Sequence, residues 1–313
     1  MVHRALFLDL KNMQEPLYWD DSYYRQFTFP VRKISSFGYL SFWSNESEDI
    51  RSGYESPFGG LWKVQENADQ ESALRHLLTV CESIPKMKSD SRIFIRSAPD
   101  CLFDSQHYLE TSFLYRIGFE KEYEEIDHLV LLEDRIQDKW NRNRKREFKK
   151  TEKFVETIVL KEFAEVALIV EVLDKNRRNR GLVNDLTIEK LSIMNSYFGE
   201  KMKLYFTIDS DRNEVIAAGV CQILTSEIAY VYKWGDIRDS KIQSFGMSPM
   251  SNLANGIFTD LKNIGIKKVY LGSSSLLGQK DEGLSRFKES FGAISTSKQI
   301  LSITIGKIYD ILR

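Results

Sequence analysis

The sequence predicts an α+β fold of two tandem domains of one kind, each a mixed, mostly antiparallel twisted sheet flanked by helices. Three observations predict it. The chain has 313 residues, and domains usually hold about 100–200 residues, so two domains are expected. Helix and strand patterns alternate along both halves. Their order in the first half recurs in the second at an offset of roughly 175 residues, as an internal duplication would produce.

The first half contains helix and strand patterns with clear stop signals. Apolar residues from Leu74 to Ile84 fall on one helical face. A second helix, from about Ser105 to Ile117, ends at Gly118, a typical C-terminal residue. The strand patterns are Ser36–Trp43, Ile93–Ile95 and Ile126–Leu132, and a Gly-rich turn lies at Ser56–Gly60.

The second half has two helix patterns, then three strands whose order favours an antiparallel meander. Ser248 and Pro249 suit the N-cap and first turn of a further helix, which ends at Gly265. The other predicted elements are helices Phe163–Leu173, Leu186–Phe198 and Gly283–Phe291, and strands Leu204–Ile208, Val215–Leu224, Ile228–Trp234, Val269–Leu271 and Ile300–Ile305.

Segments of the two halves match in pairs. Ile93–Ser97 matches Val269–Ser273, and Ile117–Phe119 matches Ser290–Gly292. The helices that precede the first pair share nearly the same offset. A helix that joins two strands implies that they pair in parallel, so each sheet is expected to be mixed.

Composition excludes several classes of protein. With 44 basic and 45 acidic residues the net charge is -1, so no overall field draws the chain to nucleic acid or lipid. An aromatic content of 12% argues against disorder. The three cysteines, Cys81, Cys101 and Cys221, are too widely spaced for a zinc knuckle or a disulfide framework, and no metal site is expected.

Histidine is scarce. The last of the four histidines is His128, so we expect no histidine-based catalytic or metal centre built from the second half alone.

Apolar runs are short. Ala5–Leu8 is too short for a signal-peptide core, and the longest uncharged stretch, Val215–Ser226, falls short of the ~20 residues that span a bilayer. The expectation is a soluble, cytoplasmic protein.

A basic connector separates the predicted domains, which cover residues 1–135 and 156–313 around a linker at 136–155. Lys139–Lys150 holds seven basic residues and one acid. It is either a solvated helix or a phosphate-binding surface, for tRNA for example, on which Trp140 stacks. A second basic cluster, Lys175–Arg180, interacts with the end of a helix dipole or lines an anion-binding cleft.

The segment from Gln243 to Pro249 joins a strand to a helix. Unpaired amide groups at a helix N-terminus hold phosphates well, and Gly246 would let a ligand approach the backbone. An ordinary capped helix begins in the same way.

Three motifs resemble known families. Gln243-x-x-Gly246-x-Ser248 resembles the donor-binding turn of the GNAT acyltransferase superfamily, with Ser in place of the usual Gly or Ala. Phe113–Glu120 resembles the Leu-Tyr-x-x-x-Gly-Phe segment of that superfamily. Gly283–Gly292, with Phe287-Lys288 at its centre, is similar to the Fem-type peptidoglycan-bridge aminoacyltransferases and related tandem acetyltransferases.

This resemblance implies a donor, acetyl-CoA, another acyl-CoA or an aminoacyl-tRNA, bound where two strands splay in the second domain. Gln243, Gly246, Met247 and Ser248 would bind it. The first domain would shape the acceptor cleft. The residues implied for substrate binding are Tyr232, Trp234 and Ser274, and those implied for catalysis are Asp236, Ser273 and Lys288.

Each of these residues also has a simpler interpretation. Tyr232 and Trp234 suit core packing on a strand, Ser273 and Ser274 suit a polar loop, and Lys288 suits a solvated helix face. Glu227 is a second candidate for the catalytic base, in addition to Asp236. Tyr115 matches the position of the superfamily's general acid, but it lies in the half without the donor turn, which favours a core role. The turn at 56–60 is an acceptor-binding edge or a plain β-turn.

The resemblance therefore implies an N-acyltransferase that moves an acyl or aminoacyl group from a thioester or tRNA donor to an amine. The acceptor it implies is a sugar nucleotide or a cell-envelope precursor, with cell-envelope biosynthesis as the setting. The competing hypothesis is a catalytically inactive GNAT-like binding module.

Overall fold

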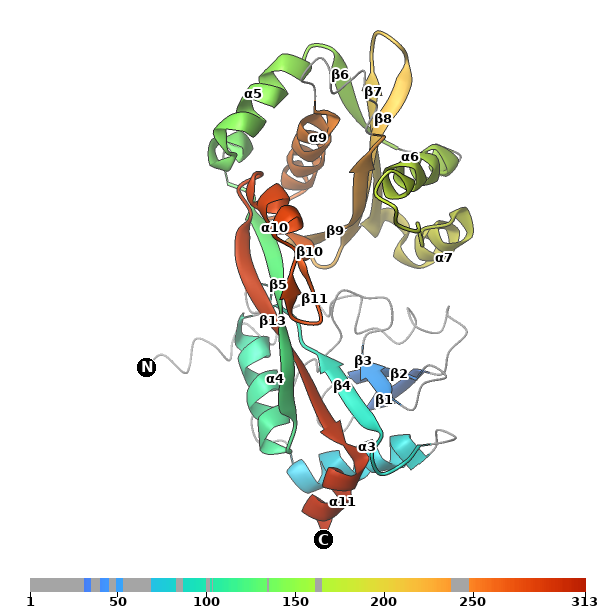
Figure 1. Ribbon diagram of the computed structural model, residues 1–313, viewed down its shortest axis with the longest axis vertical. Helices are drawn as coiled ribbons and strands as arrows, with labels where there is room; N and C mark the ends of the chain where they lie inside the picture. The colour runs from blue at the N-terminus through green and yellow to red at the C-terminus, as the bar shows by residue number, and fades with distance from the viewer. Residues whose placement is uncertain are drawn as a thin grey trace. The chain divides into compact units, whose positions relative to one another are not determined.

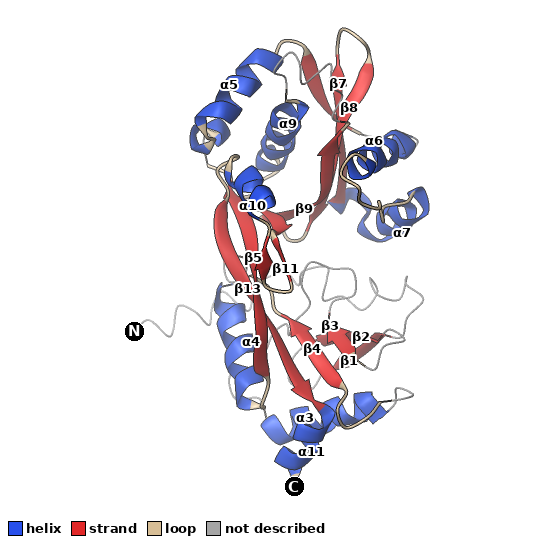
Figure 2. Cartoon of the chain, viewed as in Figure 1, coloured by secondary structure: helices blue, strands red, loops and turns tan. Residues whose placement is uncertain are grey.

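The computed structural model describes residues 31–34, 40–44, 49–52, 69–82, 87–99, 102, 104–133, 135–160, 165–237 and 248–313. They form two compact units. Unit 1 comprises Met1–Asp127, Ser273–Asp281 and Thr296–Arg313, and unit 2 comprises His128–Gly272 and Glu282–Ser295. Figure 1 labels their elements, and Figure 2 colours them by type.

The two units are not consecutive halves of the chain. The predicted division at 136–155 placed all of residues 156–313 in the second domain, whereas residues 296–313 lie in unit 1. The physical reason is pairing, because the last strand pairs antiparallel with Arg92–Arg96. The roles predicted for two tandem domains stay predictions.

Unit 1 is a sheet with helices. Its strands neighbour one another in the order β1-β2-β3-β4-β13-β5, and β11 and β12 form a separate hairpin. Its elements are β1 (Val31–Ile34), β2 (Leu40–Ser44), β3 (Ile50–Ser52), α3 (Gln70–Glu82), β4 (Arg92–Arg96), α4 (Asp104–Arg116), β5 (Glu120–Leu131) as far as Asp127, β11 (Ser275–Leu276), β12 (Gln279–Lys280), β13 (Ile294–Thr304) from Thr296, and α11 (Ile305–Leu312).

The core of unit 1 confirms the predicted helix face. Leu74, Leu77, Leu78 and Cys81 are buried, where they pack with residues of β4, α4 and β13. The short helix α11, absent from the prediction, begins where the Thr304 side chain accepts a hydrogen bond from the backbone N–H of Lys307.

Unit 2 is built on an antiparallel meander with one parallel strand. Its strand order is β5-β10-β9-β8-β7-β6. Its elements are β5 from His128, η2 (Ile136–Lys139), α5 (Arg142–Thr151), β6 (Val155–Val159), α6 (Val166–Arg178), α7 (Ile188–Phe198), η4 (Gly199–Lys201), β7 (Met202–Asp209), β8 (Glu214–Ile223), β9 (Ile228–Asp236), α9 (Pro249–Asn263), β10 (Lys268–Ser273) as far as Gly272, α10 (Glu282–Glu289) and β13 as far as Ser295.

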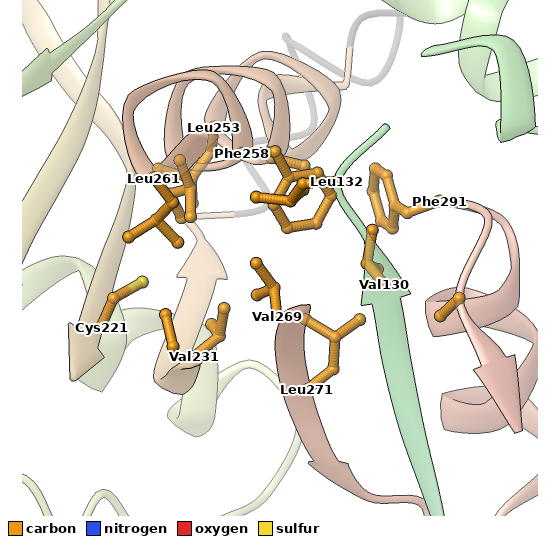
Figure 3. Packing of buried hydrophobic residues seen from close by; sticks show 14 of the residues in the cluster. Val130, Leu132, Cys221, Val231, Leu253, Phe258, Leu261, Val269, Leu271 and Phe291 are labelled. Atoms are coloured by element: carbon orange, nitrogen blue, oxygen red, sulfur yellow. The ribbon is translucent and has the colours of Figure 1, made fainter. Parts of the chain in front are cut away.

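Helices cover both faces of the unit 2 sheet. A Cβ at Gly219 on β8 would lie 2.9 Å from Ile257 of α9, whereas one at Gly235 on β9 would lie 2.7 Å from Asn176 of α6. The apolar stripe of α9 packs with Val231, and the cluster extends to β5, β10 and the residues after α10. Figure 3 shows this core. The α+β fold and the meander are confirmed.

The predicted connector is part of unit 2. It contains α5, whose N-cap residue Asn141 accepts a hydrogen bond from the N–H of Arg144, and α5 packs beside α9. Trp140 is buried against Phe148 and Phe291, so the idea that Trp140 stacks on a ligand is wrong. No helix in the described part of the chain is both long enough and apolar enough to cross a membrane.

Unit 2 is expected to lose stability at high pH. Tyr205 of β7 is buried and donates a hydrogen bond of 2.8 Å to Asp260 of α9. Burial first, and then Cys221 and Asp260, raise the pKa of Tyr205 far above its usual 10.0. In the unfolded chain Tyr205 ionises near pH 10, whereas in the folded unit it does not. The contribution of Tyr205 to the stability of unit 2 is therefore complete below about pH 10 and is lost as the pH rises further.

Urea denaturation at about pH 8 and about pH 11 measures this loss. Tyr205→Phe is the matched variant, and its alkaline loss should be smaller. An equal loss in both proteins would assign the effect to other groups.

Candidate functional site

Two strands of unit 2 run together and then part. The parallel register of β9 and β10 reaches the pair Tyr230–Tyr270, and no further register pair joins them within the described residues. β9 continues to Asp236 with its other edge paired to β8. Beyond Tyr230, β9 therefore runs on without β10 as its ladder partner, and a strand edge of this kind can pair with an extended chain that carries amides.

A β-bulge follows the parting point at once. Lys233 lies opposite Val220, whereas Val231 lies opposite Cys221, so Tyr232 is an extra residue on β9. Bulges are frequent beside active sites, where they redirect side chains and free backbone groups from the ladder.

The bulge separates the aromatic residues of β9. The Trp234 ring lies 5.6 Å from that of Phe287, in the core on the α9 side. Tyr232 instead packs edge-on against Tyr230 at 6.0 Å, and the Lys233 ammonium lies 5.6 Å from the Tyr232 ring centroid. Trp234 thus packs against the core, and substrate binding by Tyr232 and Trp234 stays a prediction.

Lys288 reaches the end of β10. Its ammonium donates a hydrogen bond of 2.8 Å to the carbonyl of Gly272, and the residue is only 3% exposed. Gly272 has a φ of +75°, and an added Cβ would contact the Tyr230 ring at 3.5 Å. The expectation of a solvated Lys288 is wrong, since a buried cation stands beside the parting strands.

A polar network holds the helix that carries Lys288. His128 is fully buried, and its Nε2 lies 3.1 Å from the Ser285 hydroxyl of α10. The same hydroxyl donates a hydrogen bond of 2.9 Å to Glu289. The contacts among His128, Ser285 and Glu289 tie α10 to β5.

His128 also corrects an expectation. The second half of the sequence holds no later histidine, yet His128 belongs to unit 2, because the unit boundary falls within β5. Unit 2 therefore contains an imidazole that counting along the chain assigned elsewhere.

Ser248 stands at the start of α9. Its side chain does not cap the helix, and its hydroxyl accepts a hydrogen bond of 2.9 Å from Arg144 of α5. Arg144 also donates to Ser290, and its guanidinium lies over the Phe291 ring at 4.7 Å. Helix α5 and the residues that follow α10 thus meet at the N-terminus of α9. Gln243, Gly246 and Met247 lie outside the described residues, as does the predicted turn at 56–60.

The two candidate bases occupy opposite ends of β9. Asp236 is its last residue, and its carboxylate and carbonyl both accept from Asn176. Glu227 precedes the first residue of β9 and pairs with Lys267. Along the strand, Glu227 lies roughly 25–30 Å from Asp236. Glu227 lies before the parting point, on the side where β9 pairs with β10, whereas Asp236 lies beyond it, on the part of β9 that has left β10.

Ser273 and Ser274 belong to unit 1. The Ser273 hydroxyl contacts Asp127 at 2.6 Å and Glu125 at 3.0 Å. The backbone N–H of Ser274 donates to Ile126. The structure thus groups Asp236, Lys288, Tyr232, Trp234 and Ser248 in one unit and these two serines in the other.

Tyr115 is not a core residue. It is 43% exposed, and its hydroxyl donates to Gln299 at 2.8 Å. The exposed residues of α5 form a basic face, and they are Arg142, Asn143, Arg146, Lys149 and Lys150. In α6, Lys175, Arg177 and Arg178 occupy the last turn, where they interact favourably with the helix dipole.

Comparisons with known proteins agree on the fold. No protein-family model matches the sequence, and no curated protein sequence does. Among solved structures, FemX has a TM-score of 0.66 over 99% of this chain and 97% of its own, at 10% identity. A C-terminal domain assigned to a lysylphosphatidylglycerol synthetase of Agrobacterium fabrum has 0.60 over 99% and 94%, at 12% identity.

A tandem GNAT protein from the clavulanic acid biosynthesis pathway has a TM-score of 0.53 over 96% of this chain and 94% of its own, at 8% identity. The chain has a tandem GNAT-like fold, which it shares with FemX. At such low identity these likenesses show the GNAT-like fold alone, so the activity of the chain has to be argued from its site.

Sequence reasoning missed three features of this candidate site. The bulge at Tyr232 leaves no mark in a run of apolar and aromatic residues. In the sequence, Arg144 is one of the seven basic residues of the connector. Only its partly buried contacts in the structure distinguish it from the other six. The pattern from Gly283 to Gly292 did indicate Lys288, although not its burial.

Proposed function

We propose that this protein is an N-acyltransferase that moves an acyl or aminoacyl group from a thioester or tRNA donor to an amine. The acceptor class we propose is a sugar nucleotide or a cell-envelope precursor, used in the cytoplasm. The observation that carries the proposal is the parting of β9 and β10, with a bulge at Tyr232 and the buried Lys288 ammonium beside it.

The proposed reaction joins an amine to an acyl carbon. The amine nitrogen attacks the carbonyl carbon, the new C–N bond forms, and the bond to sulfur or to the ribose oxygen breaks. The amine loses a proton, for which Asp236 is the proposed base, and the leaving group gains one. Negative charge develops on the carbonyl oxygen, where the Lys288 ammonium and a β9 backbone N–H would stabilise it.

The residues present fit an acyl-CoA or an aminoacyl-tRNA donor. The open edge of β9 suits the amide groups of an extended acyl carrier. The N-terminus of α9, with Ser248 and Arg144 beside it, suits a phosphate. The exposed basic face of α5 suits an RNA backbone.

Incubation of the purified chain with labelled donors tests the proposal. One arm offers acetyl-CoA and amino sugars, and the other offers aminoacyl-tRNA and the same amines. Donor-dependent amide formation in either arm supports an acyltransferase, and the productive arm identifies the donor class. Thermal stabilisation by acyl-CoA without amide formation in either arm would favour the inactive binding module.

The double variant Gly246→Arg, Ser248→Arg is expected to weaken donor binding by a factor of about 100 or more, because it would add two bulky side chains just before α9, where the donor phosphates are proposed to bind. Calorimetric titration with the productive donor measures this. Unchanged binding would remove the donor site from the start of α9. Lys153→Arg, at an exposed position after α5, is the control.

A further inference from the structure

Unit 1 contains a buried charged cluster outside the proposed acyl-transfer site. Glu125 and Asp127 lie two residues apart on β5 and so face the same way. Lys298 of β13 lies 3.2 Å from a carboxylate oxygen of each, and its ammonium donates to the Ser273 hydroxyl at 2.8 Å. Asp127, Lys298 and Glu125 are 0%, 2% and 7% exposed.

The hydrogen bonds within this cluster reach only some of its acceptor oxygens. Lys298 has three N–H donors and Ser273 has one O–H. They are directed at Glu125 Oε2, Asp127 Oδ1 and the Ser273 oxygen. Asp127 Oδ2 is buried and has no hydrogen-bond partner among the described residues.

The charges do not balance either. Two carboxylates face one ammonium, so one negative charge is uncompensated by the described residues in contact with the cluster. Buried charges are normally paired, because their desolvation is costly. Both the missing donor at Oδ2 and the missing positive charge would be supplied by one cationic hydrogen-bond donor.

We propose that the cluster of Glu125, Asp127, Lys298 and Ser273 is a binding site for a primary ammonium group. An ammonium carries one positive charge and three N–H donors, which match the excess carboxylate and the unpartnered Oδ2. A metal ion fits less well, since the described residues include no group of three or more His, Cys, Asp and Glu side chains that could hold one. The cluster approaches solvent at Ser273, which is half-buried.

This site rests on the contacts within unit 1 and does not depend on the proposed function. A binding measurement without an acyl donor separates the two.

Calorimetry and thermal denaturation with n-butylammonium chloride test the site, and 1-butanol serves as the neutral probe of equal length. The ammonium should bind and raise the unfolding temperature, and the alcohol should do neither. Asp127→Asn should weaken ammonium binding at least tenfold. Because this variant removes a buried charge and keeps the shape, it should fold. Glu125→Gln is a second variant with the same expectation.

Glu120→Gln is the matched control. It removes a carboxylate from the same strand, at an exposed position that pairs with Lys307, and should leave ammonium binding unchanged. Absence of binding to the natural chain, or equal binding to Asp127→Asn, overturns the site. Acyl transfer without ammonium binding would refute this inference alone, and ammonium binding without acyl transfer would refute only the proposed function.

Discussion

Lys288→Met is expected to lower kcat of the proposed acyl transfer by a factor of about 100–1,000, the usual effect of removing one donor to a developing oxyanion. The ammonium lies at the end of β10, where it donates to Gly272. It is 3% exposed, so its charge is weakly screened by water and acts strongly on nearby charge. Single-turnover kinetics with the productive donor measure the change.

The pattern of the loss assigns the role. A fall in kcat with an unchanged donor Kd indicates stabilisation of the transition state, whereas a raised Kd with unchanged kcat indicates contact with a donor phosphate. Lys153→Met, at an exposed position of the same unit, should have no effect on either. A folded Lys288→Met protein with natural kcat and Kd would remove Lys288 from the mechanism.

Periodicity predicted most of the fold. The face of α3 and the meander of β7, β8 and β9 carry strong apolar patterns, and both were found. The first half of β5 and of β13 escaped notice, because Glu120–Glu125 and Ile294–Gln299 are largely polar. These strands are held by pairing with neighbours, which no local pattern records.

The division into units depends on the same long-range pairing. β13 lies beside β4, about 200 positions earlier in the chain. The constant sequence offset between matching segments indicated an internal duplication. It could not show with which unit the last strand, β13, pairs. That is why His128 and Ser273 each lie in a unit other than the one their sequence position suggested.

The candidate site shows the same limit. A local motif indicated Lys288 and the start of α9, since both belong to short patterns. The β-bulge at Tyr232 and the contact between Arg144 and Ser248 depend on register and on tertiary packing. Those two features decide which backbone and side-chain groups face a ligand, so chemistry could be inferred from sequence only at the level of residue type.

Lys298→Met is expected to lower the free energy of unfolding of unit 1 by about 3–5 kcal/mol, the typical cost of removing one partner from a buried ion pair. Lys298 is 2% exposed and contacts both Glu125 and Asp127. Without it, two carboxylates remain buried with no countercharge from β13. A loss of that size is a large share of the roughly 5–15 kcal/mol that stabilises a domain. Urea denaturation followed by circular dichroism measures it.

Two further variants separate charge from packing. In the triple variant Lys298→Met, Glu125→Gln, Asp127→Asn, most of the stability should return, because a neutral cluster avoids the desolvation of unpaired ions. Lys307→Met breaks an exposed pair with Glu120 and should cost less than about 1 kcal/mol. If Lys298→Met were no more destabilising than Lys307→Met, the cluster would be open to water in solution. If instead the triple variant stayed as unstable as Lys298→Met, the loss would come from packing of the lysine side chain and not from its charge.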